Sequence, residues 1–366
     1  MSFAELLPKT TTPEEEEGVL FCSSEEGVRD AVKMRPAGKL LFVTDGSALR
    51  AFRTYLPPRA LCLVLDIEDC LPLFLTSDDV AMVVAAGSKS TLVAARFFAE
   101  IRKIPCAVFP VSAALDGAYE AYDNVLLGSH ESRVALKKAA VYCDQELVAP
   151  DLGQAYMRLL LSRLALIEAK AMRGLGLDAG CDTAQERAYR ALLPLKGKTL
   201  TWKEVAATNA RIRQCEREGM AAGEGTLLAR EIGAHGAEQA YFLLLALYAA
   251  FFSKGRARLS VPDYAARARA AGAAYAEQRV PTLQEFFARV SALERIRSEL
   301  SLELNSLIEG ETHFRRNFYA LEGRAPGEAR AIRFLKELPE RAAGLSAVIR
   351  DFGLMEWDEE FFIKSV

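Results

Sequence analysis

Residues 79–117 hold the pattern that most restricts what this chain can fold into. An apolar, Val-rich run over residues 80–85 has the composition of a strand buried on both faces of a parallel sheet. It ends at the small residues Ala86, Gly87 and Ser88, after which the apolar spacing predicts a helix to about residue 102. A second apolar strand is predicted over residues 105–110. Strand, tight turn, helix and strand together predict a βαβ unit, which is right-handed in nearly all proteins.

The residues on either side continue this alternation. Further strands are predicted over residues 39–44, 60–66 and 134–143, with a short apolar segment over 19–22 and helices over 23–34 and 47–55. Strands separated by helices at this spacing predict a doubly wound parallel sheet for the first 145 residues or so.

The pattern changes after Pro150, where apolar residues recur with helical spacing and no strand is predicted. The predicted helices cover residues 154–173, 184–193, 202–218, 226–253 and 282–307. We therefore expect an α/β, nucleotide-binding-like domain over residues 1–148 and an all-α domain over residues 149–366. A chain of 366 residues is long enough for two such domains.

Composition narrows the partners and the compartment. The net charge is −3, so no basic excess points to nucleic acid. Seven scattered cysteines without a CxxC motif are typical of reduced core thiols in a reducing compartment. The longest apolar run, over residues 240–252, is shorter than the roughly 20 residues that span a bilayer. We expect a cytoplasmic protein without a membrane span. The sequence is compatible with a homo-oligomer as well as with a monomer.

Three landmarks carry a resemblance to a known family. They are Ala85-Ala86-Gly87-Ser88, Phe109-Pro110-Val111 and Asp116-Gly117. Their order and spacing resemble the glycerol-1-phosphate dehydrogenases and the iron-containing alcohol dehydrogenases, which belong to the dehydroquinate synthase-like superfamily. The family turn has three glycines, of which only Gly87 is kept.

The resemblance implies a fold and a reaction. The fold is a doubly wound sheet followed by an all-α domain. The reaction is the NAD- or NADP-dependent reduction of a small phosphorylated ketone, in which a divalent metal (zinc, iron or nickel) polarises the carbonyl oxygen.

Four residues are predicted to bind the cofactor. Backbone N–H groups at Gly87 and Ser88 would face a phosphate at the start of a helix, and Lys89 would supply a positive charge. Asp45, which follows the strand over residues 39–44, would accept a hydrogen bond from a ribose hydroxyl. The alternative for both segments is a plain turn between a strand and a helix.

Asp116 is the predicted catalytic residue, because the resemblance implies that this aspartate lies beside the substrate hydroxyls. The family threonine just before it is Val111 here, which cannot donate a hydrogen bond. The alternative is that Asp116 is a turn or helix-capping residue.

His235 is the one predicted metal ligand, since the segment from His235 to Glu238 resembles the family's His-Gly-Glu. The family also uses a second histidine and a carboxylate from an earlier helix. Here the second histidine appears as Thr226, and no Asp or Glu occurs between Gln154 and Ile167. We therefore expect a degenerate metal site.

Three functions follow from these residues. The first is a dehydrogenase of the glycerol-1-phosphate type. The second is a non-catalytic descendant that binds a nucleotide or another anionic ligand in the cleft between the domains, as a sensor or partner subunit. The third is a purely structural role.

Overall fold

The structure is a computed structural model that describes residues 14–46, 48–65, 69–174, 180–195, 197–221, 223–232, 236–254, 283–322 and 345–346. The chain divides into two compact units. One comprises Met1–Asp151 and Trp202–Arg213, and the other comprises Leu152–Thr201 and Gln214–Val366. Among the described helices, none combines the length and the apolar character needed to cross a bilayer.

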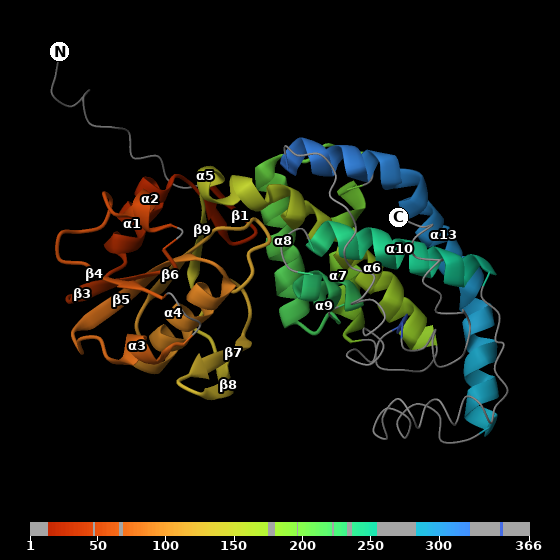
Figure 1. Cartoon of the computed structure of the whole chain (residues 1–366), viewed down its shortest axis with the longest axis horizontal. Helices are drawn as coiled ribbons and strands as arrows, with labels where there is room; N and C mark the ends of the chain where they lie inside the picture. The colour runs from red at the N-terminus through yellow and green to blue at the C-terminus, as the bar shows by residue number, and fades with distance from the viewer. Residues whose placement is uncertain are drawn as a thin grey trace, which may run out of the picture. The chain divides into compact units, whose positions relative to one another are not determined.

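The first unit is built on a seven-stranded sheet (Figure 1). Its strands, in spatial order, are β1 (Glu14–Glu16), β2 (Val19–Phe21), β9 (Ala140–Cys143), β6 (Cys106–Pro110), β5 (Val80–Gly87), β3 (Lys39–Thr44) and β4 (Leu61–Val64). Every pairing is parallel except that of β1 with β2 at the edge. All eight residues of β5 are buried, as the apolar run predicted for a strand covered on both faces.

Helices cover both faces of this sheet. On one face, residues of α1 (Ser24–Lys33) and α2 (Leu49–Phe52) pack on alternate strand residues such as Phe42, Val84 and Phe109. Figure 1 shows α3 (Leu71–Phe74) and α4 (Lys89–Arg102) on the other face. The predicted doubly wound α/β architecture is therefore confirmed for this unit.

Local sequence signals account for the ends of the two longer helices. Ser23 and Glu26 form a reciprocal capping box at the start of α1, and Glu25 and Glu26 place negative charge in its first turn. The carboxyl end of α4 is set by Lys103, whose backbone adopts a left-handed conformation with φ of 55° and so ends the helix.

The strand predicted over residues 134–143 is wrong in one respect: it is two strands in two sheets. β8 (His130–Ala135) pairs antiparallel with β7 (Tyr122–Leu127) in a separate hairpin, while β9 joins the main sheet. The two lysines at positions 137 and 138 interrupt the apolar pattern, and the chain leaves one sheet for the other there. The predicted helix over 47–55 is also shorter, since α2 covers only Leu49–Phe52.

The second unit is helical in its described part, apart from one isolated bridge between Gly180 and Met220. Its helices are α6 (Leu152–Gly174), α7 (Asp182–Leu192), α9 (Glu224–Ile232), α10 (Gly236–Lys254) and α13 (Leu283–Glu322), with the short segment η3 (Leu193–Leu195) directly after α7. The short segments α5 (Gln145–Val148) and η2 (Ala149–Asp151) are the last residues of the first unit before α6 begins. Helix α8 (Trp202–Arg217) contributes its last residues to this unit. The apolar α10 packs against α6, α9 and α13.

One predicted helix of this unit is corrected. The span 226–253 is divided between α9 and α10, and the three residues 233–235 lie outside the described residues. The long last helix runs further than predicted, to Glu322. Its apolar spacing continues past Leu307, with Phe314 and Phe318 buried, so packing rather than a stop signal sets its length.

Arg96 on α4 ties the loops of the first unit together. The side chain is 1% exposed. Its guanidinium donates from Nη1 to the Gly117 carbonyl at 2.6 Å, from Nη2 to the Glu120 carbonyl at 2.6 Å and from Nε to the Lys137 carbonyl at 2.8 Å. These bonds hold the loop after β6 and the segment between β8 and β9 against the helix.

We expect Arg96→Ala to lower the free energy of unfolding by roughly 3–5 kcal/mol, because one buried and two partly buried carbonyls lose their donor and each such loss costs about 1–3 kcal/mol. Urea denaturation of the full chain measures the change. Arg102→Ala on the same helix is the matched control. Arg102 pairs with the 91% exposed Asp78, so its loss should cost less than about 1 kcal/mol. Equal effects of the two substitutions would contradict this role of Arg96.

Candidate functional site

The predicted cofactor residues meet where the strand order of the sheet reverses. The chain passes from β3 outward to β4 on one side, and from β5 outward to β6 on the other. Ligands of open parallel sheets bind at the carboxyl ends of the strands that flank such a point. Thr44 of β3 pairs with Ala86 of β5. Asp45 and Gly87 therefore follow neighbouring strands at this position.

Asp45 makes a direct contact with the turn. Its Oδ2 accepts a hydrogen bond from the Ser88 backbone N–H at 2.7 Å. A Cβ on Gly87 would lie only 2.8 Å from the same oxygen, so the carboxylate can approach because that residue is glycine. The amino end of α4, which the sequence predicted as a phosphate site, thus faces a carboxylate of the chain itself.

The ammonium group of Lys89 also has a partner. Its Nζ lies 2.6 Å from Oδ2 of Asp123 on β7. The two groups form an ion pair without the alignment of a hydrogen bond. The predicted positive charge for a phosphate is therefore compensated in part by the hairpin.

Asp116 lies in the loop after β6 and pairs with a cation. Arg213 Nη2 lies 2.7 Å from Asp116 Oδ1, and Arg213 Nε donates to the Ala114 carbonyl at 3.2 Å. The loop is tightly turned there, with Leu115 at φ 56° and Gly117 at φ 81°. The side chains of Asp116 and Arg213 are 21% and 12% exposed, so the pair is largely screened from water.

Sequence reasoning missed a second carboxylate at the same edge. Asp144 follows β9, and its Oδ2 accepts from both the backbone N–H and the hydroxyl of Ser24, each at 2.6 Å. Asp144 is 8% exposed. The signal was present, because an aspartate directly after a predicted strand can reach the amino end of a helix at the same edge.

His235, the predicted metal ligand, lies outside the described residues. Within the described part, no group of three His, Cys, Asp or Glu side chains could hold a metal ion. In α6, where the resemblance implies a carboxylate ligand, neither Asp nor Glu occurs between Gln154 and Ile167. Gln154 itself accepts a hydrogen bond at its Oε1 from the Ala237 N–H at 3.1 Å. This part of the helix therefore does not fit a site of one carboxylate and two imidazoles.

A buried carboxyl pair occupies another part of the second unit. Glu168 on α6 and Glu224 on α9 both contact the Tyr248 hydroxyl, at 2.8 and 2.9 Å. Glu168 also accepts from the Glu224 backbone N–H at 2.9 Å, and Glu224 accepts from the Ser346 hydroxyl at 2.7 Å. Burial, and next the Glu224 charge, raises the pKa of Glu168 to about 8.

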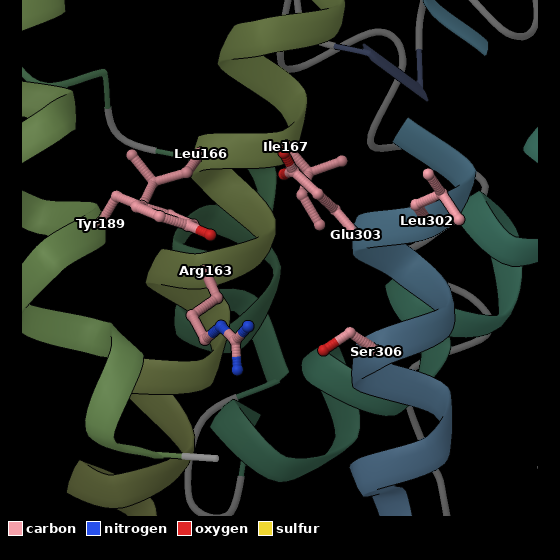
Figure 2. Close-up of a pocket in the computed structure, with 7 residues that line it drawn as sticks. All are labelled: Arg163, Leu166, Ile167, Tyr189, Leu302, Glu303 and Ser306. Carbon is pink, nitrogen blue, oxygen red and sulfur yellow. The ribbon is translucent and has the colours of Figure 1, made fainter. Parts of the chain in front are cut away.

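Two hollows in the described parts are large enough to consider, and the residues that line them do not include Asp45, Gly87, Ser88 or Lys89. The larger, about 670 Å³, lies in the first unit beyond the ends of β2 and β9. Its walls include Tyr55, Asp144, Trp202 and Lys203. The smaller, about 200 Å³, lies in the second unit and is shown in Figure 2.

Comparison with known proteins finds similarity in three-dimensional structure and none in sequence family. No family model matches this sequence, and no curated protein matches it. Similar solved structures include glycerol dehydrogenase from Schizosaccharomyces pombe, with 13% identity over 86% of this chain and 93% of that one, and a TM-score of 0.44. Maleylacetate reductase from Rhizobium sp. strain MTP-10005 has 15% identity over 91% and 98%, with a TM-score of 0.44.

An iron-containing alcohol dehydrogenase from Corynebacterium glutamicum has 15% identity over 90% of this chain and 95% of that one, with a TM-score of 0.46. At these values the likeness transfers no activity, cofactor or substrate to this chain. The functional argument therefore stands on the residues themselves.

The carboxyl pair predicts a stability that depends on pH. Folding raises the pKa of Glu168 from its ordinary value near 4.5 to about 8. Between these values the folded state holds a proton that the unfolded state has lost, so the free energy of unfolding falls as pH rises. Glu168→Gln stays neutral. Its stability relative to the parent should therefore rise from pH 5 to pH 8 by up to about 1.4 kcal/mol per pH unit.

Urea denaturation at the two pH values tests this. Glu299→Gln is the control, because Glu299 is 62% exposed in its pair with Lys170; it should shift stability by less than about 1 kcal/mol at either pH. A Glu168→Gln difference that does not change with pH would show that Glu168 is ionised in the folded protein.

Proposed function

We propose that this protein binds a nicotinamide dinucleotide at the carboxyl edge of the sheet in its first unit and acts as an oxidoreductase of the glycerol-1-phosphate dehydrogenase type. The observation that carries the proposal is the meeting of Asp45 with Gly87 and Ser88 at the switch point between β3 and β5. This is where open parallel sheets bind nucleotides.

The position of Asp45 favours NAD over NADP. An acidic side chain at the end of a neighbouring strand accepts a hydrogen bond from the ribose 2′-hydroxyl of NAD, and its charge repels the 2′-phosphate of NADP. A carboxylate offers about four lone-pair sites, so the bond from the Ser88 N–H does not by itself prevent a contact with a ribose hydroxyl. Asp45 can therefore orient the turn and contact a ribose.

The substrate proposed from the resemblance is a small phosphorylated ketone. The bound nicotinamide would supply the hydride that reduces its carbonyl carbon. Asp116 is proposed to lie beside the substrate hydroxyls, with its orientation fixed by Arg213. No step is derived through a metal ion, because α6 has no Asp or Glu where the resemblance implies a carboxylate ligand. Seven free cysteines support a reducing, cytoplasmic location.

A non-catalytic binding protein is the second candidate, and two observations favour it. Lys89 and Asp116 each have a charged partner within the first unit, so neither side chain is held ready for a substrate. The part of α6 where the resemblance implies a metal carboxylate has neither Asp nor Glu. Such a protein would bind a nucleotide or another anion without reducing a ketone.

The nucleotide preference tests the first candidate. We expect NADH to raise the melting temperature of the full chain and NADPH to do so less, because only ligands bound to the native state stabilise it. Asp45→Asn keeps an acceptor for the Ser88 N–H but removes the charge. It should narrow the NADH-to-NADPH affinity ratio by about tenfold.

Asp144→Asn is the matched control. It removes a charge from the same edge of the sheet, at the end of β9, and should leave the NADH-to-NADPH affinity ratio unchanged.

The oxidation of NADH in the presence of dihydroxyacetone phosphate, followed by absorbance, separates the two candidates. Binding with turnover supports the dehydrogenase, and binding without turnover supports the non-catalytic protein. If neither nucleotide shifts the melting temperature at millimolar concentration, nucleotide binding is wrong.

A further inference from the structure

Arg163 on α6 is a partly buried cation that forms no hydrogen bond through its Nη1, and no ion pair, with the described residues. Its Nη1 is fully buried, and among the described residues it has no hydrogen-bond acceptor. No carboxylate in the described part forms an ion pair with it, and burial lowers the pKa of its guanidinium. Burial of an unpaired charge costs several kcal/mol, so such groups in proteins are usually paired or bind an ion.

A hollow of about 200 Å³ opens beside this guanidinium. Figure 2 shows Arg163 on α6 and Ser306 on α13 pointing into the space between the two helices. Leu166, Ile167 and Leu302 supply apolar surface to the walls, and the ring of Tyr189 on α7 closes one side. An apolar cavity of about 150 Å³ is enough to hold benzene. The hollow therefore has room for a small organic molecule.

The polar groups around the hollow are mainly donors. The Ser306 hydroxyl has no hydrogen-bond partner among the described residues. The buried hydroxyl of Tyr241 on α10, which interacts electrostatically with Arg163, also lacks one. Glu303 is the one carboxylate in the walls, and it interacts electrostatically with Arg163. Lys170 pairs with both Glu303, at 2.7 Å, and the more exposed Glu299, at 2.6 Å. The two cations therefore balance the two carboxylates, and the buried Nη1 of Arg163 still has no acceptor among the described residues.

We propose that this hollow is a binding site for a small monocarboxylate with an apolar body about the size of benzoate. The planar guanidinium matches the two oxygens of a carboxylate in a way that it does not match an uncharged polar group. The Ser306 hydroxyl donates to the same group, and the leucine and isoleucine side chains cover the apolar body. A dianion such as phosphate fits less well, since the apolar walls leave its remaining oxygens without donors.

The site lies wholly within the second unit, so it is independent of nucleotide binding in the first. It goes beyond the proposed oxidoreductase activity and gives the chain a second ligand, whose chemistry is set by Arg163.

Calorimetric titration of the full-length protein with benzoate, benzamide and inorganic phosphate tests the proposal. We expect saturable binding of benzoate, with benzamide and phosphate each at least tenfold weaker, because benzamide has the same shape without the charge. Arg163→Met should weaken benzoate binding by about tenfold or more, and Ser306→Ala by about threefold.

Arg173→Gln is the matched control. It removes a cation from the same helix, ten residues or about 15 Å further along, where Arg173 pairs with Asp182 and Gln185. It should leave benzoate affinity unchanged. Because Arg163→Met removes an unpaired buried charge, its melting temperature without ligand should not fall.

Three results would overturn the proposal. They are no heat of benzoate binding at roughly 10 mM, equal binding of benzoate and benzamide, and tighter binding of phosphate than of benzoate. The comparison of ligands on the unaltered protein decides the matter even if a variant fails to fold.

Discussion

The first unit depends on carboxylates that its own strands place at the amino ends of its helices. A helix start carries unpaired N–H groups and a partial positive charge, both of which a carboxylate satisfies. Asp45 does this for α4 from the end of β3, and Asp144 does it for α1 from the end of β9. In a parallel sheet the strand ends and the helix starts share one edge, so the same geometry that binds phosphates in other proteins is used here for cohesion.

Two arginines, one buried and one partly buried, show how one residue type can serve opposite purposes. Arg96 in the first unit donates to three backbone carbonyls, and its charge is spread over them. Arg163 in the second unit is left with a buried nitrogen that no described group accepts from. Both occur in helices with apolar neighbours, and nothing in the flanking sequence separates them. The difference lies in whether loop carbonyls or a hollow face the guanidinium.

Much of the architecture could be predicted because its signals are local. The unbroken apolar run of β5, the Ser23 and Glu26 capping pair and the helical spacing of α6 each depend on residues within a few positions of one another. The β7–β8 hairpin was missed because its residues are mostly exposed or only partly covered, so it has no continuous apolar run. In the sequence, the change of sheet at Lys137 and Lys138 resembles an interruption of one strand. The split between α9 and α10 was missed although Gly233 and Gly236 stand there in the sequence, because the apolar helical spacing on both sides outweighed them.

By itself the sequence determined the order of strands and helices, the burial of the central strands and the position of the turn after β5, since these follow from side-chain periodicity and from glycine. Tertiary structure alone decided what the polar side chains at that turn contact. Asp45 and Ser88 are 43 residues apart in the sequence, and Asp116 and Arg213 are 97 residues apart. Such pairs form only when the strand order and the path of the loops bring the two residues together. Which group a charged side chain pairs with depends on the residues that the fold brings next to it, and the local sequence does not determine this.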